Sequence, residues 1–134
     1  MVDNMSKRGF DPLTYRFEGE EPEPGGIKEV ADGVFWARMP MWDRLNHINV
    51  WLLRDNEAWT VVDTGLNRED IQKCWQTIFD TFLEGKPVTR IFATHLHGDH
   101  TGNAGWICRK WGAELWMSRS DFYMCKVMAA DGPN

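Results

Sequence analysis

The sequence predicts an α/β domain with a mixed β-sheet, βαβ units and helices on one face of the sheet. In the first half of the chain, short apolar segments with alternating polar residues favour β-strands joined by turns. Farther along, strand-like segments alternate with amphipathic helical ones, and such units pair their strands in parallel through a right-handed crossover. The 134 residues are 43% hydrophobic and 26% charged, which is typical of one globular domain with its own core.

Residues 1–30 are expected to form an extended acidic arm before the folded part, residues 31–134. Four glutamates are interspersed with Pro and Gly over residues 18–26, a composition that favours extended, solvated chain. The alternative for this segment is a tail that binds a partner. The first residues lack the apolar core of a secretion signal, and no apolar run approaches membrane-spanning length, so the expected location is the cytoplasm.

Three strands are predicted next, at Val34–Arg38, Ile48–Leu53 and Trp59–Asp63. Residues 55–57 have turn chemistry between the second and third strands. A helix should then run over residues 67–84, with Asn67 as its N-cap and acidic residues in its first turn. One apolar stripe at helical spacing supports this helix. Its members are Ile71, Cys74, Trp75, Ile78, Phe79 and Phe82.

A second strand–helix–strand unit follows. Residues 88–94 form a strongly apolar strand, residues 103–111 a helix and residues 113–117 another strand, and Ser118 can cap a last helix. With helices on one face, the other sheet face should carry residues such as Val50, Val61 and Phe92 or Ile91, without a cover. An uncovered apolar face favours association, and a two-fold homodimer is the simplest form of it.

Three of the four histidines lie within six residues, in the segment His95-Leu96-His97-Gly98-Asp99-His100. On extended backbone His95 and His97 point the same way, so they can converge on one ion. Gly98 lets the chain turn, and Asp99 and His100 then approach from another direction. Imidazole and carboxylate both suit Zn²⁺ and its first-row neighbours. The segment therefore predicts a metal site at the end of a buried strand.

The pattern H-x-H-x-D-H resembles the signature of the metallo-β-lactamase superfamily. Val62-Asp63-Thr64-Gly65, after an apolar strand, resembles the first motif of that family. The resemblance implies a domain with two Zn²⁺ ions, or Fe or Mn in their place. His95 and His97 would be ligands of the first metal, and Asp99 and His100 ligands of the second. Asp63, with Thr94, would be a supporting residue that orients the ligands.

By the same resemblance the fold is half of a four-layer αββα sandwich. The family pattern has a third histidine, a bridging carboxylate and a last histidine downstream, whereas no histidine follows His100 in this sequence. We therefore expect the chain to be the N-terminal portion of such a domain. Because His100 follows Asp99 and His97 stands where the diiron branch favours Glu, the motif is more similar to glyoxalase-II-like or lactonase-like hydrolases.

The implied activity is hydrolysis of an ester, thioester, lactone or related small molecule by hydroxide held at the metals, with Asp99 catalytic as well as a ligand. Two alternatives remain open: a non-catalytic, self-associating chain with a partial metal site, and a nuclease-type relative. The net charge of −5 argues against nucleic acid as a partner, because phosphate binding calls for a basic face.

The loop between the first two predicted strands, residues 39–45, contains exposed-looking apolar residues. In the family such a loop often lies over the site, so Met41 and Trp42 are candidates for substrate contact, with packing against another part of the protein as the alternative. His47, at the end of this loop, is interpreted as a structural hydrogen-bonding residue, with a place beside the substrate as the alternative.

Overall fold

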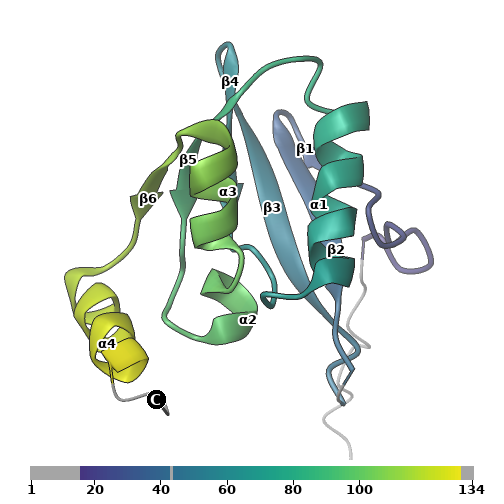
Figure 1. Ribbon diagram of the computed structural model, residues 1–134. Helices are drawn as coiled ribbons and strands as arrows, with labels where there is room; N and C mark the ends of the chain where they lie inside the picture. Colours follow the sequence, from purple (N-terminus) through teal and green to yellow (C-terminus); the bar gives the residue numbers. More distant parts are fainter. Residues whose placement is uncertain (1–15, 43, 131–134) are drawn as a thin grey trace, which may run out of the picture.

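The computed structural model describes residues 16–42 and 44–130, and its centre is a six-stranded mixed sheet in the spatial order β1-β2-β3-β4-β5-β6 (Figure 1). The first four strands are antiparallel neighbours, and β4, β5 and β6 run parallel. This is the mixed sheet that the sequence predicts. The strands are β1 Lys28–Ala31, β2 Val34–Pro40, β3 His47–Asp55, β4 Ala58–Val62, β5 Val88–Phe92 and β6 Glu114–Trp116.

Two helices, α1 and α3, cover one face of the sheet, as predicted (Figure 1). Each is the crossover of a βαβ unit: α1 connects β4 to β5, and α3 connects β5 to β6. The described helices are α1 Glu69–Thr81, α2 Gly98–Thr101, α3 Ala104–Trp111 and α4 Arg119–Ala130. Ser118 caps α4 as expected, since its hydroxyl accepts the Asp121 backbone N–H at 3.1 Å. No helix in the described ranges is both long and apolar enough to cross a membrane.

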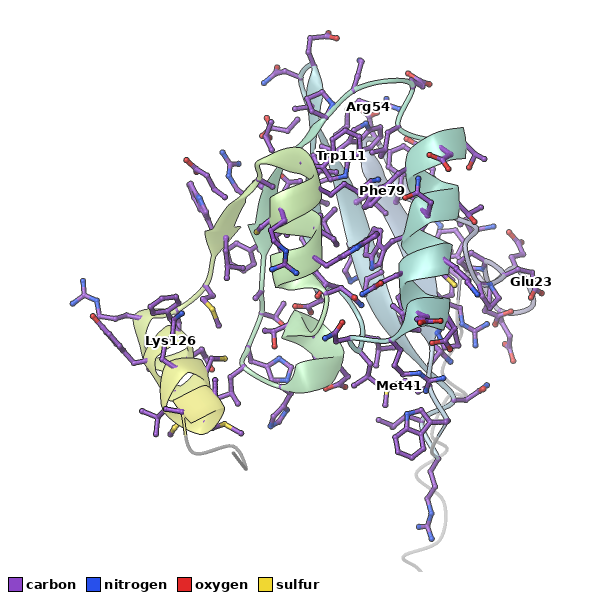
Figure 2. All side chains as sticks on the ribbon, viewed as in Figure 1. Glu23, Met41, Arg54, Phe79, Trp111 and Lys126 are labelled. Atoms are coloured by element: carbon purple, nitrogen blue, oxygen red, sulfur yellow. The ribbon has the colours of Figure 1, made fainter. Side chains whose placement is uncertain are left out.

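The core lies between the sheet and the α1–α3 layer. The predicted α1 stripe faces it, with Ile71, Trp75, Ile78 and Phe79 buried. Phe79 makes an edge contact with Trp111 of α3, at 5.4 Å between ring centroids, and so links the two helices (Figure 2). Rings of this size bury much apolar area, which stabilises the docking of both helices on the sheet.

The expected composition of the uncovered sheet face is wrong for Val50 and Val61 and right for Phe92 rather than for its alternative, Ile91. Val50, Val61 and Ile91 are fully buried under the helices, and only Phe92 lies on the opposite face, where it is 45% exposed. The period-two pattern separates the faces but does not say which one the helices cover, because both carry apolar side chains. The open face also carries Trp36, Trp51, Leu53, Val62 and Trp116, which are half-buried or exposed.

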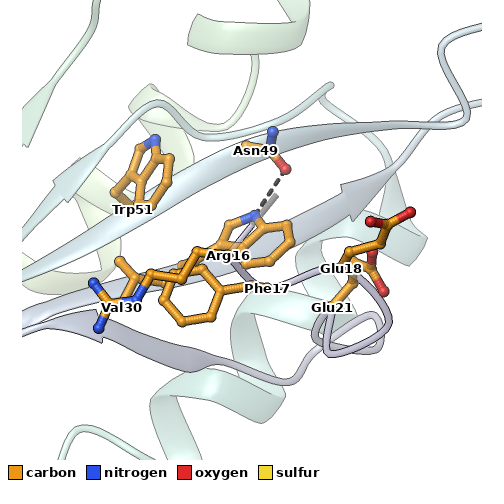
Figure 3. A pocket seen from close by; sticks show the side chains of 8 residues that line it. Arg16, Phe17, Glu18, Glu21, Val30, Asn49 and Trp51 are labelled. Carbon is orange, nitrogen blue, oxygen red and sulfur yellow. Dashed lines mark hydrogen bonds between the residues drawn. The ribbon is translucent and has the colours of Figure 1, made fainter. Parts of the chain in front are cut away.

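The predicted arm does not remain a solvated chain up to residue 30. Residues 28–31 form β1 and pair with β2, and Pro22 is buried. Phe17 and Arg16 lie over the open face near Asn49 and Trp51, around a hollow of about 680 Å³ (Figure 3). A four-residue strand with charged members gives too weak an alternation to be recognised in sequence. Residues 1–15 of the predicted arm lie outside the described ranges.

Several element boundaries also differ from expectation, and two of them lie beside the loops that follow β4 and β5. The N-cap of α1 is Arg68 with extended backbone, not Asn67, whose side-chain oxygen instead accepts a hydrogen bond from Gln72. The strand predicted over residues 88–94 ends at Phe92. The segment after it bends, because the Thr94 backbone N–H bonds the Asp63 side chain rather than a neighbouring strand.

Candidate metal centre

The candidate ligands lie at the carboxyl ends of β4 and β5. Asp63 and Thr64 follow β4, while Thr94, His95 and His97 follow β5. Asp99 and His100 belong to α2, a one-turn helix that the sequence predicts only as a turn at Gly98. Parallel strands end at the same sheet edge, so the two loops meet there, and this is where α/β folds commonly place their sites.

Asp63 is the anchor of this region. It is 4% exposed and has a positive φ of 60°, a conformation that Asp and Asn tolerate better than most residues. Its Oδ1 accepts the Thr94 backbone N–H at 2.8 Å, and its Oδ2 accepts the Thr94 hydroxyl at 2.8 Å. The carboxylate thereby holds the β5 loop against the β4 loop.

The same carboxylate determines which nitrogen of His100 is free. His100 Nδ1 lies 2.8 Å from Asp63 Oδ2, and because a carboxylate only accepts, Nδ1 carries the proton. The lone pair of the neutral ring is then on Nε2. A carboxylate behind an imidazole in this way fixes the tautomer and orientation of a metal-binding histidine.

Thr94 fixes the tautomer of His95 in the same way. The single hydroxyl hydrogen of Thr94 goes to Asp63, so its oxygen accepts the hydrogen of His95 Nδ1, 3.0 Å away. His95 Nε2 is therefore also left with its lone pair. One buried carboxylate thus orients two of the three clustered imidazoles.

The four predicted ligands approach one another as two pairs. His97 Nδ1 lies 3.0 Å from His95 Nε2, to which it donates a hydrogen bond, and His100 Nε2 lies 3.4 Å from Asp99 Oδ2. Two ligand atoms about 2.1 Å from a tetrahedral Zn²⁺ lie roughly 3.4 Å apart, so each pair is close to the spacing that a shared ion requires. The pairs are also those that the family resemblance assigns to the first and second metals.

Neither pair is a complete coordination shell. Within residues 16–42 and 44–130, no three of the His, Cys, Asp and Glu side chains surround a common point that could hold an ion. The donor types and pair distances fit Zn²⁺ or a first-row neighbour, with the remaining positions left to other ligands or water. The ligand roles of His95, His97, Asp99 and His100 stay predictions.

Asn103 was predicted only as a helix start, yet it holds the site loops together. Fully buried, its Nδ2 donates to the carbonyl of Leu66 at 2.5 Å and to that of Thr64 at 3.2 Å. Its backbone N–H reaches Thr64 Oγ1, and that hydroxyl donates to the His100 carbonyl at 2.9 Å. An Asn at the start of a helix is usually predicted to be its N-cap. The sequence pattern therefore did not show that Asn103 joins the two loops by hydrogen bonds.

Gly102, between α2 and α3, lies where two backbones nearly touch. A Cβ there would be 2.5 Å from Asn67 N and 2.6 Å from Gly98 O. Its own φ of −56° is ordinary, so the requirement is for space rather than for backbone freedom. This close approach brings α2, with Asp99 and His100, against the loop that follows Asp63.

The predicted substrate loop lies beside the ligands. Met41 and Trp42 line a cavity of about 400 Å³ together with His97 and Asp99, and Leu45 and Leu66 contribute apolar side chains to it. Met41 is at the α2 end of the sheet (Figure 2). Trp42 is 78% exposed, so its indole is not used in the core.

His47 is not brought to the metal ligands. Its Nδ1 lies 2.8 Å from Arg38 Nη2 across the β2–β3 pair. Burial, and then the charge of Arg38, lower the pKa of His47 below its ordinary value. The structural hydrogen-bonding role of His47 stays a prediction.

Comparison with known proteins identifies the family. A family model described as the metallo-beta-lactamase superfamily matches residues 43–127, more than half of the chain. The chain belongs to this superfamily. A crystal structure of a beta-lactamase domain protein from Burkholderia ambifaria superposes with a TM-score of 0.84 and 43% identity, over 87% of this chain and 37% of that one. The superfamily fold predicted from the two motifs is confirmed.

Curated relatives of this superfamily member include two named acyl-coenzyme A thioesterase MBLAC2. The human protein is 32% identical over 85 residues, and the Bos taurus protein is 31% identical over 81 residues. In each case the match covers 56% of this chain and 29% of the relative. The chain thus spans less than a third of the curated relatives that it matches.

Proposed function

We propose that this superfamily member is a metal-dependent hydrolase of thioesters, with an acyl group carried on a coenzyme A-like thiol as its substrate. The sequence motif supports the hydrolase class, and the similarity to relatives named acyl-coenzyme A thioesterases favours thioesters over other esters and lactones. Zn²⁺ is the proposed metal, since three imidazoles and a carboxylate suit it, and Fe or Mn would accept the same donors.

The observation that carries the proposal is the arrangement around Asp63. Its bonds to His100 and to Thr94, and through Thr94 to His95, leave the Nε2 lone pairs of both rings unprotonated. A histidine used only for packing has no need of a fixed tautomer. Two imidazoles held ready to accept an ion at one sheet edge support metal binding more directly than their presence in a motif does.

Four residues of this chain would bind the metal ions and orient the attacking water. His95 and His97 would hold one ion, and Asp99 and His100 a second. A bound ion supplies a Lewis acid and lowers the pKa of water towards about 7. Asp99 would also accept a hydrogen bond from the attacking water and so direct it towards the thioester carbonyl.

The apolar cavity beside the ligands suits the acyl group. Met41, Trp42, Leu45 and Leu66 surround it, and His97 and Asp99 form its polar side. Burying an acyl chain there contributes about 0.8 kcal/mol per CH₂ group. A longer acyl chain should therefore bind more tightly than an acetyl group does.

The test is cleavage of acyl-coenzyme A of several chain lengths by the zinc-loaded chain, with free coenzyme A followed by chromatography. A thiol reagent is unsuitable because Cys74, Cys108 and Cys125 are free. We expect slow turnover, below about 1 per second, because the described ligands form pairs rather than complete shells. It should be lost with a chelator and in Asp99→Asn, and kept in Asp80→Asn, an exposed acidic residue of α1.

Equal rates for the wild type and Asp99→Asn, or rates that a chelator does not change, would contradict the proposed metal-dependent reaction. Faster cleavage of lactones or β-lactams than of thioesters would contradict the substrate class alone.

A further inference from the structure

A small cavity of about 230 Å³ lies where β2 ends and β3 begins, beside the loop that reaches the candidate metal centre. Arg38 and His47 provide its cationic and imidazole side chains, and Pro40 and Asn46 are also among its lining residues. At about 30 Å³ per water molecule, it has room for several waters or for one polyatomic ion with its solvent. Neither the proposed reaction nor the metal ligands use this cavity.

Arg38 is a cation without a carboxylate partner in the described part of the chain. No described Asp or Glu oxygen forms an ion pair with its guanidinium, and its Nε is buried with no described acceptor. Other partly buried arginines differ in this respect, since Arg90 pairs with Asp55. A half-buried guanidinium without an ion-pair partner has donors available for an external anion.

His47 adds a second donor. Arginine only donates, so His47 Nδ1 accepts from Arg38 Nη2 at 2.8 Å. A neutral His47 ring then carries its hydrogen on Nε2. Burial and Arg38 lower the pKa of His47. The ring is therefore neutral at pH 7, with Nε2 as its hydrogen-bond donor.

Two acidic residues lie nearby, and neither forms an ion pair with Arg38, although backbone hydrogen bonds, and then the charges of Arg38 and His47, lower the pKa of Glu21. Glu21 is exposed, and its carboxylate accepts the Gly19 backbone N–H at 3.2 Å. Glu23 lines the cavity, yet its side chain is exposed at the outer edge of the molecule (Figure 2). These carboxylates would repel a bound anion, so its hydrogen bonds to Arg38 and His47 have to outweigh that repulsion.

The cavity and the hollow beside the candidate metal centre are lined by neighbouring residues of one hairpin loop. Asn46 and His47 border the cavity, while Met41, Trp42 and Leu45 border the hollow that contains His97 and Asp99. The Met41 backbone N–H bonds the Asn46 carbonyl at 2.7 Å and closes the neck of the loop. A substrate with its reactive carbonyl near Asp99 could extend along this loop to Arg38.

We propose that Arg38 and His47 bind a phosphate group on the thiol-bearing half of the substrate. This proposal rests on the proposed thioesterase function, because coenzyme A has phosphate groups at the end remote from its thioester. Guanidinium binds phosphate through parallel charge-assisted hydrogen bonds, and the imidazole N–H contributes a further one. The acyl end of the substrate would then contact Met41, Trp42 and Leu45, and the carrier end Arg38 and His47.

The test uses the metal-free chain with ¹⁵N-labelled arginine and histidine side chains, titrated with inorganic phosphate, coenzyme A, dephospho-coenzyme A and pantetheine. We expect saturable shifts at Arg38 and His47 with the three phosphate-bearing probes and none with pantetheine. Arg38→Gln should weaken coenzyme A binding by about tenfold or more. Arg109→Gln, which removes an exposed charge on α3, should leave it within about twofold.

Shifts confined to other residues, shifts that do not saturate, or equal binding by the wild type and Arg38→Gln would overturn the proposal. If Arg38→Gln has a lower melting temperature than the wild type, its weaker binding is no longer evidence, and the NMR shifts of Arg38 and His47 in the wild type then test the proposal. A response to inorganic phosphate but not to coenzyme A would overturn the carrier assignment. The binding experiment uses no metal, so a failure of the zinc-loaded chain to hydrolyse acyl-coenzyme A would contradict only the proposed thioesterase function. An Arg38→Gln enzyme that is active with an unchanged KM would contradict only the phosphate-binding role of Arg38.

Discussion

Asp63 Oδ2 accepts a hydrogen bond from His100 Nδ1 at 2.8 Å, and the two residues lie 37 positions apart in the chain. The contact joins the loop after β4 to α2, and the buried carboxylate determines which nitrogen of His100 can accept an ion. A supporting role for Asp63 was implied by the family resemblance. The hydrogen-bond geometry gives that role a physical basis and makes it testable apart from catalysis.

Asp63→Asn should weaken zinc binding by roughly 10- to 100-fold, the usual effect of losing a residue that orients a ligand. Asn tolerates the positive φ of this position, so the backbone is kept, while the charge is lost and one of the two acceptor oxygens becomes an amide donor. The measurement is a competition between the protein and a chelator for zinc. Asp80→Asn serves as the control, and equal zinc affinity in both variants would contradict the role given to Asp63.

Gly102→Ala should lower the free energy of unfolding by about 2 kcal/mol or more, because the new Cβ would overlap the backbones of residues 67 and 98. Gly105→Ala is the matched control in α3, where the nearest atom is the end of the Arg109 side chain at 3.3 Å. There the helix should gain up to about 1 kcal/mol. Urea unfolding of the two variants compares them, and a Gly102→Ala protein as stable as the wild type would refute this packing.

Much of this architecture was predictable because its signals are local. The α1 stripe, the hairpin turn after β3 and the spacing of the histidine cluster each depend on residues close together in the chain. The covered sheet face was not predictable, since Val50 and Trp51 are both apolar and only helix docking separates them. Asn103 was missed for a related reason: its partners, Thr64 and Leu66, are distant in sequence.

The pKa of His47 should be measured below its ordinary value of 6.5, with burial as the larger cause and Arg38 as the next. Glu21 opposes the shift. The folded chain then binds fewer protons than the unfolded one, so this residue's contribution to stability is complete above about pH 6.5 and is lost as the pH falls through the folded pKa. Titration by NMR tests this, and Arg38→Gln should move the midpoint upward. A midpoint at or above 6.5 in the wild type would be contrary to the structure.

We propose that the 134-residue chain associates through the open sheet face, with a two-fold dimer as the simplest form. Phe92 is 45% and Trp116 48% exposed there, and burial of apolar area stabilises by about 25 cal/mol per Å². Phe92→Gln should shift sedimentation towards the monomer, whereas Tyr123→Gln on the exposed side of α4 should not. A wild type that stays monomeric at tens of micromolar would reject this association.

The central claim is that His95, His97 and His100 are metal ligands at one site and that His47 is not. The chain has four histidines, so a zinc titration of the ¹⁵N-histidine-labelled protein observes every one of them. We predict that the signals of His95, His97 and His100 shift together, with weak affinity, and that the shifts disappear in His97→Ala. His47 should keep its position throughout. Zinc-induced shifts at His47 equal to those of the other three, or no shifts at millimolar zinc, would contradict the account.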